Sequence, residues 1–246
     1  MMNNNLFNNN IGENIMSLSQ DRPTNPAKLY LKVKSGAIVY YDKEAQENIT
    51  VPTPLEFIVL DQLATIKGWS DADESGYWSN EVRSVGRDVL TVRTSKGVKE
   101  QGIWKEIKGS IGVAGAKYNS SAYVATKGRD GLEINNLSLT GAALNAWIEF
   151  TQKNNITKNK IVLSGWSDAK KGSVSYKVPI FEAVPMGESE REEAVALDRQ
   201  LQDYLNEYFN YTPDETGDVP TRGFQKDTIV DHIDDEPINL DDIPFN

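Results

Sequence analysis

Runs of alternating apolar and polar side chains fill most of the chain from about residue 27 to residue 184. The clearest run is segment 29–34, whose two faces carry different side chains: Leu29, Leu31 and Val33 against Tyr30, Lys32 and Lys34. Segment 174–180 alternates likewise, with its apolar side chains at even positions. A period of two is typical of strands that bury one face. The sequence therefore predicts a mainly β fold.

Three further segments belong to this pattern. Segment 103–113 has two faces, with Ile103, Ile107, Ile111 and Val113 on one and Trp104, Glu106 and Lys108 on the other. Read as a strand, it places Trp104 beside Lys108 on a solvent-facing surface. Segments 55–66 and 160–163 are more continuously apolar and fit central strands, although the pattern leaves helix or strand open for 55–66.

Two helices interrupt or follow the strands. Segment 139–150 has apolar residues at helical spacing, with Ser138 or Thr140 as its N-cap. Segment 189–209 opens on Ser189-Glu-Arg-Glu192, a capping-box pattern, and carries an apolar stripe that docks on the body or on a second subunit.

Many short strands around one helix fit a small barrel, and the OB-fold is a small barrel that binds nucleic acids. We therefore expect an OB-fold-like barrel in residues 28–186, with long hairpins or insertions because this body exceeds a minimal barrel. Residues 187–210 form the acidic C-terminal helix. Residues 1–27 are an Asn-rich leader and residues 211–246 an acidic tail, and we expect both to be disordered.

The net charge of −10 divides unevenly along the chain. Residues 187–246 hold 17 acidic and 4 basic side chains, whereas residues 1–186 hold 19 and 22. The body is thus mildly basic, and the acidity is concentrated in the appendage. Such asymmetry indicates nucleic-acid contact by the body and an interaction role for the tail.

Several kinds of chemistry find no candidate residues. Cysteine is absent and His232 is the single histidine, which argues against a zinc site and against Ser–His or Cys–His nucleophiles. No P-loop pattern occurs, and Asp71, Asp73 and Glu74 read as a solvated turn rather than a metal site. We therefore expect that the protein is not an enzyme and binds no cofactor. No apolar run spans a membrane and the N-terminus is not a secretory signal, so we expect a cytoplasmic protein.

Aromatic and basic side chains intermix over residues 69–129. Single-stranded DNA binders need cations for the phosphates and flat rings on which bases stack. The stacking candidates are Trp69, Tyr77, Trp78, Trp104, Tyr118 and Tyr123. The phosphate-binding candidates are Arg83, Arg87, Lys105, Lys108 and Lys117. The pentapeptide Gly-Trp-Ser-Asp-Ala occurs at 68–72 and again at 165–169, which is too short to indicate a duplication.

The C-terminal Asp241-Asp242-Ile243-Pro244-Phe245 resembles the tip of bacterial single-stranded DNA-binding proteins, in which the Phe ends the chain. In this chain Asn246 follows. Two body segments, LATIKGWSDADESGYWSNEVR and GVAGAKYNSSAYVAT, resemble phage-type single-stranded DNA-binding proteins. That resemblance implies an OB-fold body that binds single-stranded DNA and a tail tip, 241–245, that binds replication, recombination or repair proteins.

The favoured hypothesis is a non-enzymatic single-stranded DNA-binding protein of a phage or mobile element, working in the cytoplasm of a bacterial host. A homo-oligomer through segment 189–209 stays open. The alternative is an interaction protein that binds no DNA, such as an acidic DNA mimic or an inhibitor of host nucleases.

Overall fold

The computed structural model of the chain describes residues 23–210. Strands make up 50% and helices 24% of the structure, which confirms the mainly β prediction. The tail, including the tip residues Asp241, Asp242, Ile243, Pro244 and Phe245, lies outside the described residues, as does most of the leader.

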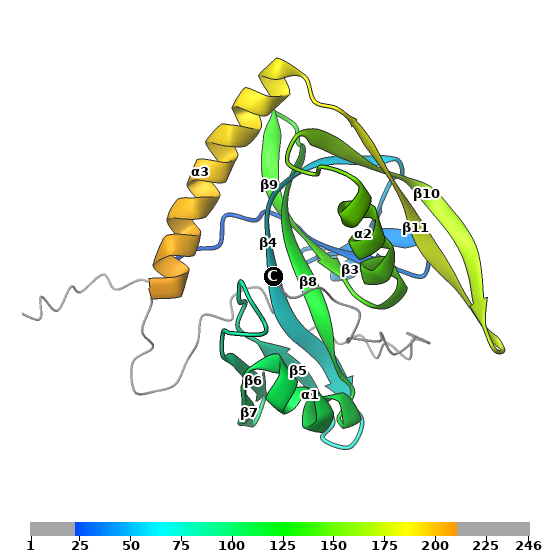
Figure 1. Cartoon of the computed structure of the whole chain (residues 1–246), viewed down its shortest axis with the longest axis vertical. Coiled ribbons are helices and arrows are strands. Elements are labelled where there is room, and N and C mark those ends of the chain that lie inside the picture. The colour runs from blue at the N-terminus through cyan, green and yellow to red at the C-terminus, as the bar shows by residue number, and fades with distance from the viewer. Residues whose placement is uncertain (1–22, 211–246) are drawn as a thin grey trace, which may run out of the picture.

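Eleven strands form one open, mixed sheet (Figure 1). In chain order they are β1 (Tyr30–Lys34), β2 (Ala37–Asp42), β3 (Glu47–Val51), β4 (Leu55–Ser70), β5 (Ser75–Ser79), β6 (Leu90–Thr94), β7 (Gly97–Gly102), β8 (Ala116–Lys127), β9 (Leu132–Leu139), β10 (Asn159–Lys171) and β11 (Val174–Pro185). The helices are α1 (Trp104–Val113), α2 (Gly141–Lys153) and α3 (Glu188–Asn210).

The sheet branches at the long strand β4. Its main path runs β3-β2-β1-β9-β8-β4-β5-β6-β7, and β1 and β9 are its parallel pair. One edge of β4 pairs with β8 along most of its length. On the other edge, β10 pairs with the start of β4 and β5 with its end. Segment 55–66, left open by the sequence pattern, is therefore the first part of a strand.

The larger core lies on the inner face of the sheet, under α2. Trp147 of α2 is 1% exposed and contacts Phe57 and Phe181, with ring centroids 6.0 and 5.1 Å away. Leu31 also lies in this core, as the alternation of segment 29–34 predicted. In β11 the alternation does not hold throughout, because Pro179 is buried while Ile180 is 41% exposed.

Segment 103–113 is helix α1, so the strand prediction for it was wrong. Trp104, Ile107 and Ile111 occupy one buried face of the helix, against the beginning of β8. Their spacing of three and four residues suits a helix. The body therefore contains two helices, α1 and α2, where the sequence predicted one.

Helix α3 confirms the predicted C-terminal helix, and it packs on the outer face of the sheet (Figure 1). Leu201 and Leu205 are fully buried there against Leu63 and Tyr123. The helix begins earlier than its predicted cap. The Gly187 backbone N–H donates to Glu190 Oε2 at 3.0 Å, so the N-cap is Gly187, two residues before Ser189, and Glu190 supplies only the side-chain half of a capping box.

Candidate nucleic-acid interface

The outer face of the sheet collects polar, basic and aromatic side chains. In β8, Ala122 and Val124 point into the inner core, so the alternating neighbours Lys117, Ser121 and Tyr123 lie on the outer face. The same alternation in β5 buries Tyr77 and puts Gly76 and Trp78 on the outer face. Cations and aromatic rings therefore lie together on this face of the sheet.

A row of four such side chains crosses four adjacent strands. Lys117 of β8 pairs with Lys67 of β4, Lys67 with Trp78 of β5, and Trp78 with Arg93 of β6. Residues directly opposite one another on paired strands share a face. At a strand spacing of about 4.8 Å, this transverse row is roughly 14 Å long. Trp69 lies next to it, two residues along β4 from Lys67.

Strand β1 continues the outer face on the other side of β8 and β9. Tyr30 pairs with Asn136 and Lys32 with Ser138, and both β9 residues in turn pair with the outer face of β8. Lys34 follows on the same face of β1 by alternation. Away from α3, these strands thus place five cations on the outer face: Lys32, Lys34, Lys67, Arg93 and Lys117.

A buried carboxylate marks the opposite end of this face. Glu81 accepts a hydrogen bond from the Tyr123 hydroxyl at 2.8 Å and another from Ser121. Asn136 Nδ2 donates to Ser121 Oγ at 2.8 Å, which ties β9 into the group. Burial raises the pKa of Glu81, and the hydrogen bonds from Ser121 and Tyr123 oppose that shift only in part.

Helix α3 is fastened beside this carboxylate. The Glu81 backbone N–H donates to the Tyr208 hydroxyl at 2.8 Å. Arg83 Nη1 pairs with Asp61 Oδ2 at 3.0 Å, and Nη2 donates to Gln202 Oε1 at 3.3 Å. The Arg83 guanidinium also lies 5.2 Å from the ring centroid of Phe209. Arg83, predicted to hold phosphate, is therefore occupied in securing the helix.

Two of the six predicted stacking residues lie on the outer face and are not fully buried. Trp69 is 37% exposed and Trp78 is half-buried. The other four are buried, which contradicts their exposure to bases: Tyr77, Trp104, Tyr118 and Tyr123. Trp104 and Tyr118 form an edge-to-face pair in the inner core, with centroids 6.0 Å apart. A ring packed on both sides cannot stack on a base while that packing holds.

The predicted cations are also distributed over different surfaces. Lys117 belongs to the transverse row. Lys105 and Lys108 lie on α1, and Arg87 is exposed in the loop between β5 and β6, where its Nε donates to Ser84 Oγ at 3.4 Å. The prediction missed Lys67, Arg93 and the β1 cations as site residues. Those of β1 had a signal in the polar face of segment 29–34, and Arg93 lies within the aromatic and basic segment 69–129, whereas Lys67 had neither signal.

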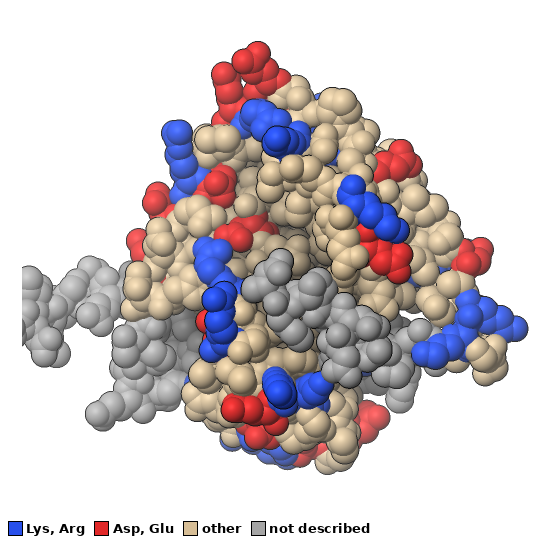
Figure 2. Space-filling model, viewed as in Figure 1, with Lys and Arg blue, Asp and Glu red and all other residues tan. Residues whose placement is uncertain are grey.

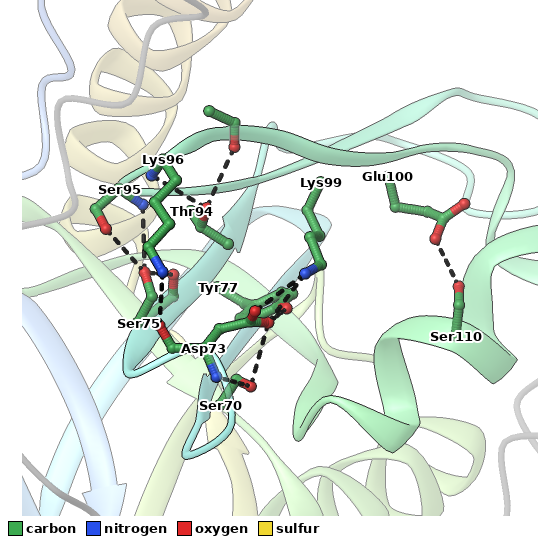
Figure 3. Close-up of polar contacts among 12 residues, drawn as sticks. Ser70, Asp73, Ser75, Tyr77, Thr94, Ser95, Lys96, Lys99, Glu100 and Ser110 are labelled. Carbon is green, nitrogen blue, oxygen red and sulfur yellow. Dashed lines mark hydrogen bonds and ion pairs between the residues drawn. The ribbon is translucent and has the colours of Figure 1, made fainter.

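The turn between β4 and β5 is held by a compact polar network (Figure 3). Asp73 accepts hydrogen bonds from the Tyr77 hydroxyl and from Ser70 Oγ, and both of its oxygens lie 3.1 Å from Lys99 Nζ of β7. The Tyr77 hydrogen bond, followed by the one from Lys99, lowers the pKa of the Asp73 carboxyl. The predicted solvated turn is thus a structured one, anchored to β7.

The two Gly-Trp-Ser-Asp-Ala copies adopt different structures. The first copy ends β4, and its Asp71 and Ala72 lie in the turn. The second copy lies entirely within β10, and Trp166 packs against the inner core. The same five residues therefore occupy different structural environments, as expected if the repeat is a short chance match.

Comparison with known proteins yields no relative: no family model, curated protein or solved structure matches the chain. Within residues 23–210, no group of three or more acidic, His or Cys side chains is placed to hold a metal ion. No helix of that same part of the chain is long and apolar enough to cross a membrane.

Proposed function

We propose that the protein binds single-stranded DNA across the outer face of its sheet. The observation that carries this proposal is the transverse row, in which Lys117, Lys67 and Arg93 flank Trp78 on adjacent strands. Cations beside flat rings supply the two interactions that sequence-tolerant single-strand binding requires.

The order of the strands supports an OB-fold as the centre of the body. Strands β4, β8 and β9 form a consecutive antiparallel meander, α2 follows, and β10 and β11 return to the free edge of β4. This corresponds to the order of a five-stranded OB barrel with a helix between its third and fourth strands. The loops that flank an OB-fold binding face are those after its first and fourth strands.

In that correspondence, both flanking loops are enlarged here. The first is the insertion that contains β5, β6, β7 and α1, and it supplies Trp78 and Arg93. The second is the tip of the β10–β11 hairpin, which extends away from the body and carries Lys170 and Lys171 (Figures 1 and 2). Lys177 in this hairpin lies against Gly36 in the β1–β2 turn, and its Nζ pairs with Asp168 Oδ1 at 2.7 Å.

The test is a fluorescence titration with oligo-dT and with duplex DNA, in which stacked tryptophans are quenched. We expect quenching with oligo-dT to shrink in Trp69→Phe and Trp78→Phe and to persist in Trp104→Phe and Trp147→Phe. Replacing Trp69 or Trp78 by Ala, which removes the stacking ring, should weaken binding about 5- to 150-fold. Equal affinity for duplex DNA, or quenching that depends on the two buried tryptophans, would refute the proposal.

We propose in addition that the tail tip, Asp241–Phe245, recruits proteins of replication, recombination or repair. Its support is the sequence of the tip, which joins acidic residues to a short apolar plug. Deleting residues 237–246 should abolish partner capture while leaving or strengthening oligo-dT affinity. Loss of DNA affinity in this variant would contradict a separate partner role.

A further inference from the structure

We propose that Trp69 and Trp78 form the two walls of a slot for one nucleobase, with Gly76 as its floor. This rests on the proposed single-strand binding function and assigns a defined subsite within it. The ligand is one unpaired base of either ring size, because stacking on both faces of a base requires no particular hydrogen-bonding edge.

The register of β4 and β5 sets the width of the slot. Trp69 lies opposite Gly76, and Trp78 lies opposite Lys67, so the two indoles are diagonal neighbours on the outer face. The backbones of diagonal neighbours on paired strands are about 7–8 Å apart, and their Cβ atoms are somewhat closer. A base between two rings needs about 7 Å, which is twice the optimal separation of stacked carbon atoms.

Gly76 is not required by the fold, and this is the main argument for a ligand. A Cβ built on Gly76 would meet only the Gly68 carbonyl oxygen, at 3.9 Å, and its φ is not in the left-handed region. Gly68 differs, because a Cβ there would lie 2.4 Å from the Gly115 carbonyl oxygen. A glycine inside a strand weakens it, and it often marks a bulge, a tight bend, or a place where another backbone or a ligand approaches closely. The β4–β5 register has no bulge at Gly76 and no backbone atom comes nearer than 3.9 Å to the added Cβ, which favours the approach of a ligand.

The two strands that carry the slot are fixed before any ligand arrives. The Asp73 network holds the β4–β5 turn against Lys99 of β7, and the Ser75 and Ser95 hydroxyls lie 3.0 Å apart (Figure 3). Because such contacts fix the strands that carry the two indoles, less conformational freedom remains to be lost when a base enters. Lys67 and Arg93 lie on either side of Trp78, where they reach the phosphates that flank the inserted base.

The test compares Gly76→Leu with Gly165→Leu, using oligo-dT that carries a single 2-aminopurine. Gly165 is a matched control, since it is another strand glycine whose added Cβ would meet nothing within 4 Å. We expect Gly76→Leu to weaken binding at least about 10-fold and to abolish the quenching of 2-aminopurine that stacking produces. Gly165→Leu should behave as wild type, and thermal melts should show both variants folded.

A second arm asks whether Gly76 acts through Trp69. In a Trp69→Ala background, Gly76→Leu should cause no further loss, because the slot is already open on one side. The slot would be refuted, but not the proposed function, if Gly76→Leu bound oligo-dT like wild type. The same holds if Gly76→Leu caused the same loss of affinity with and without Trp69. Absence of oligo-dT binding by the wild-type protein would overturn the proposed function as well, so the two failures are distinguishable.

Discussion

Neutralising two members of the transverse row should change how DNA binding depends on salt. The perturbation is the double variant Lys67→Gln, Lys117→Gln, whose residues pair directly across β4 and β8. Each phosphate contact on a single strand makes the slope of log affinity against log salt concentration more negative by about 0.7. If all five outer-face cations contact phosphate, the wild-type slope is about −3.5 and that of the variant about −2.

These slopes translate into measurable affinities. From 50 to 200 mM salt, the wild-type affinity for oligo-dT should fall about 100-fold, and the affinity of the variant only about 20-fold. The assay is fluorescence anisotropy of labelled oligo-dT at four salt concentrations. The control is Lys153→Gln, Lys158→Gln, which removes two exposed lysines at and just after the end of α2. An unchanged slope in the row variant, or the same change in the control, would refute the phosphate-binding role of the row.

Three further outcomes follow from the packing and the buried carboxylate. Trp104→Ala should lower the free energy of unfolding by about 3–5 kcal/mol, because the indole is 3% exposed, and this should appear as a melting temperature about 10 °C lower. A loss below 1 kcal/mol would mean that Trp104 is exposed rather than buried. Leu205→Ala should cost about 2–5 kcal/mol in urea titrations and Val195→Ala on the same helix under 1, since they are 0% and 44% exposed; equal costs would mean that α3 is not docked. The pKa of Glu81 is raised in the folded protein, so folding disfavours its charged form. The wild type should therefore lose stability relative to Glu81→Gln as pH rises above about 4.3. Parallel curves of melting temperature against pH for the two proteins would contradict the burial of Glu81.

Much of the secondary structure was predictable because local patterns carried it. Segment 29–34 is a strand with its leucines inside, and the helices at 139–150 and 189–209 both exist. Segment 103–113 failed for a definite reason. Ile103, Ile107 and Ile111 are four residues apart, a spacing that is both even, as in a strand, and close to one helical turn. In the helix that the structure shows, Trp104 packs against Tyr118.

The candidate site was less predictable, because it depends on register between strands. Lys67, Trp78 and Arg93 are separated in sequence by other charged and aromatic residues, and only pairing across β4, β5 and β6 brings them into one row. Tyr123 shows the opposite difficulty. It lies on the outer face, but α3 covers that part of the sheet, so an outward position does not make it accessible.

By itself, the sequence determined that this chain forms strands with a basic, aromatic body and an acidic C-terminal appendage, since alternation and charge are properties of local segments. Only the tertiary structure decided which rings face solvent and which cations stand together. Burial and proximity depend on strand register and on the helix that covers each face, and those are set by contacts between residues far apart in the chain.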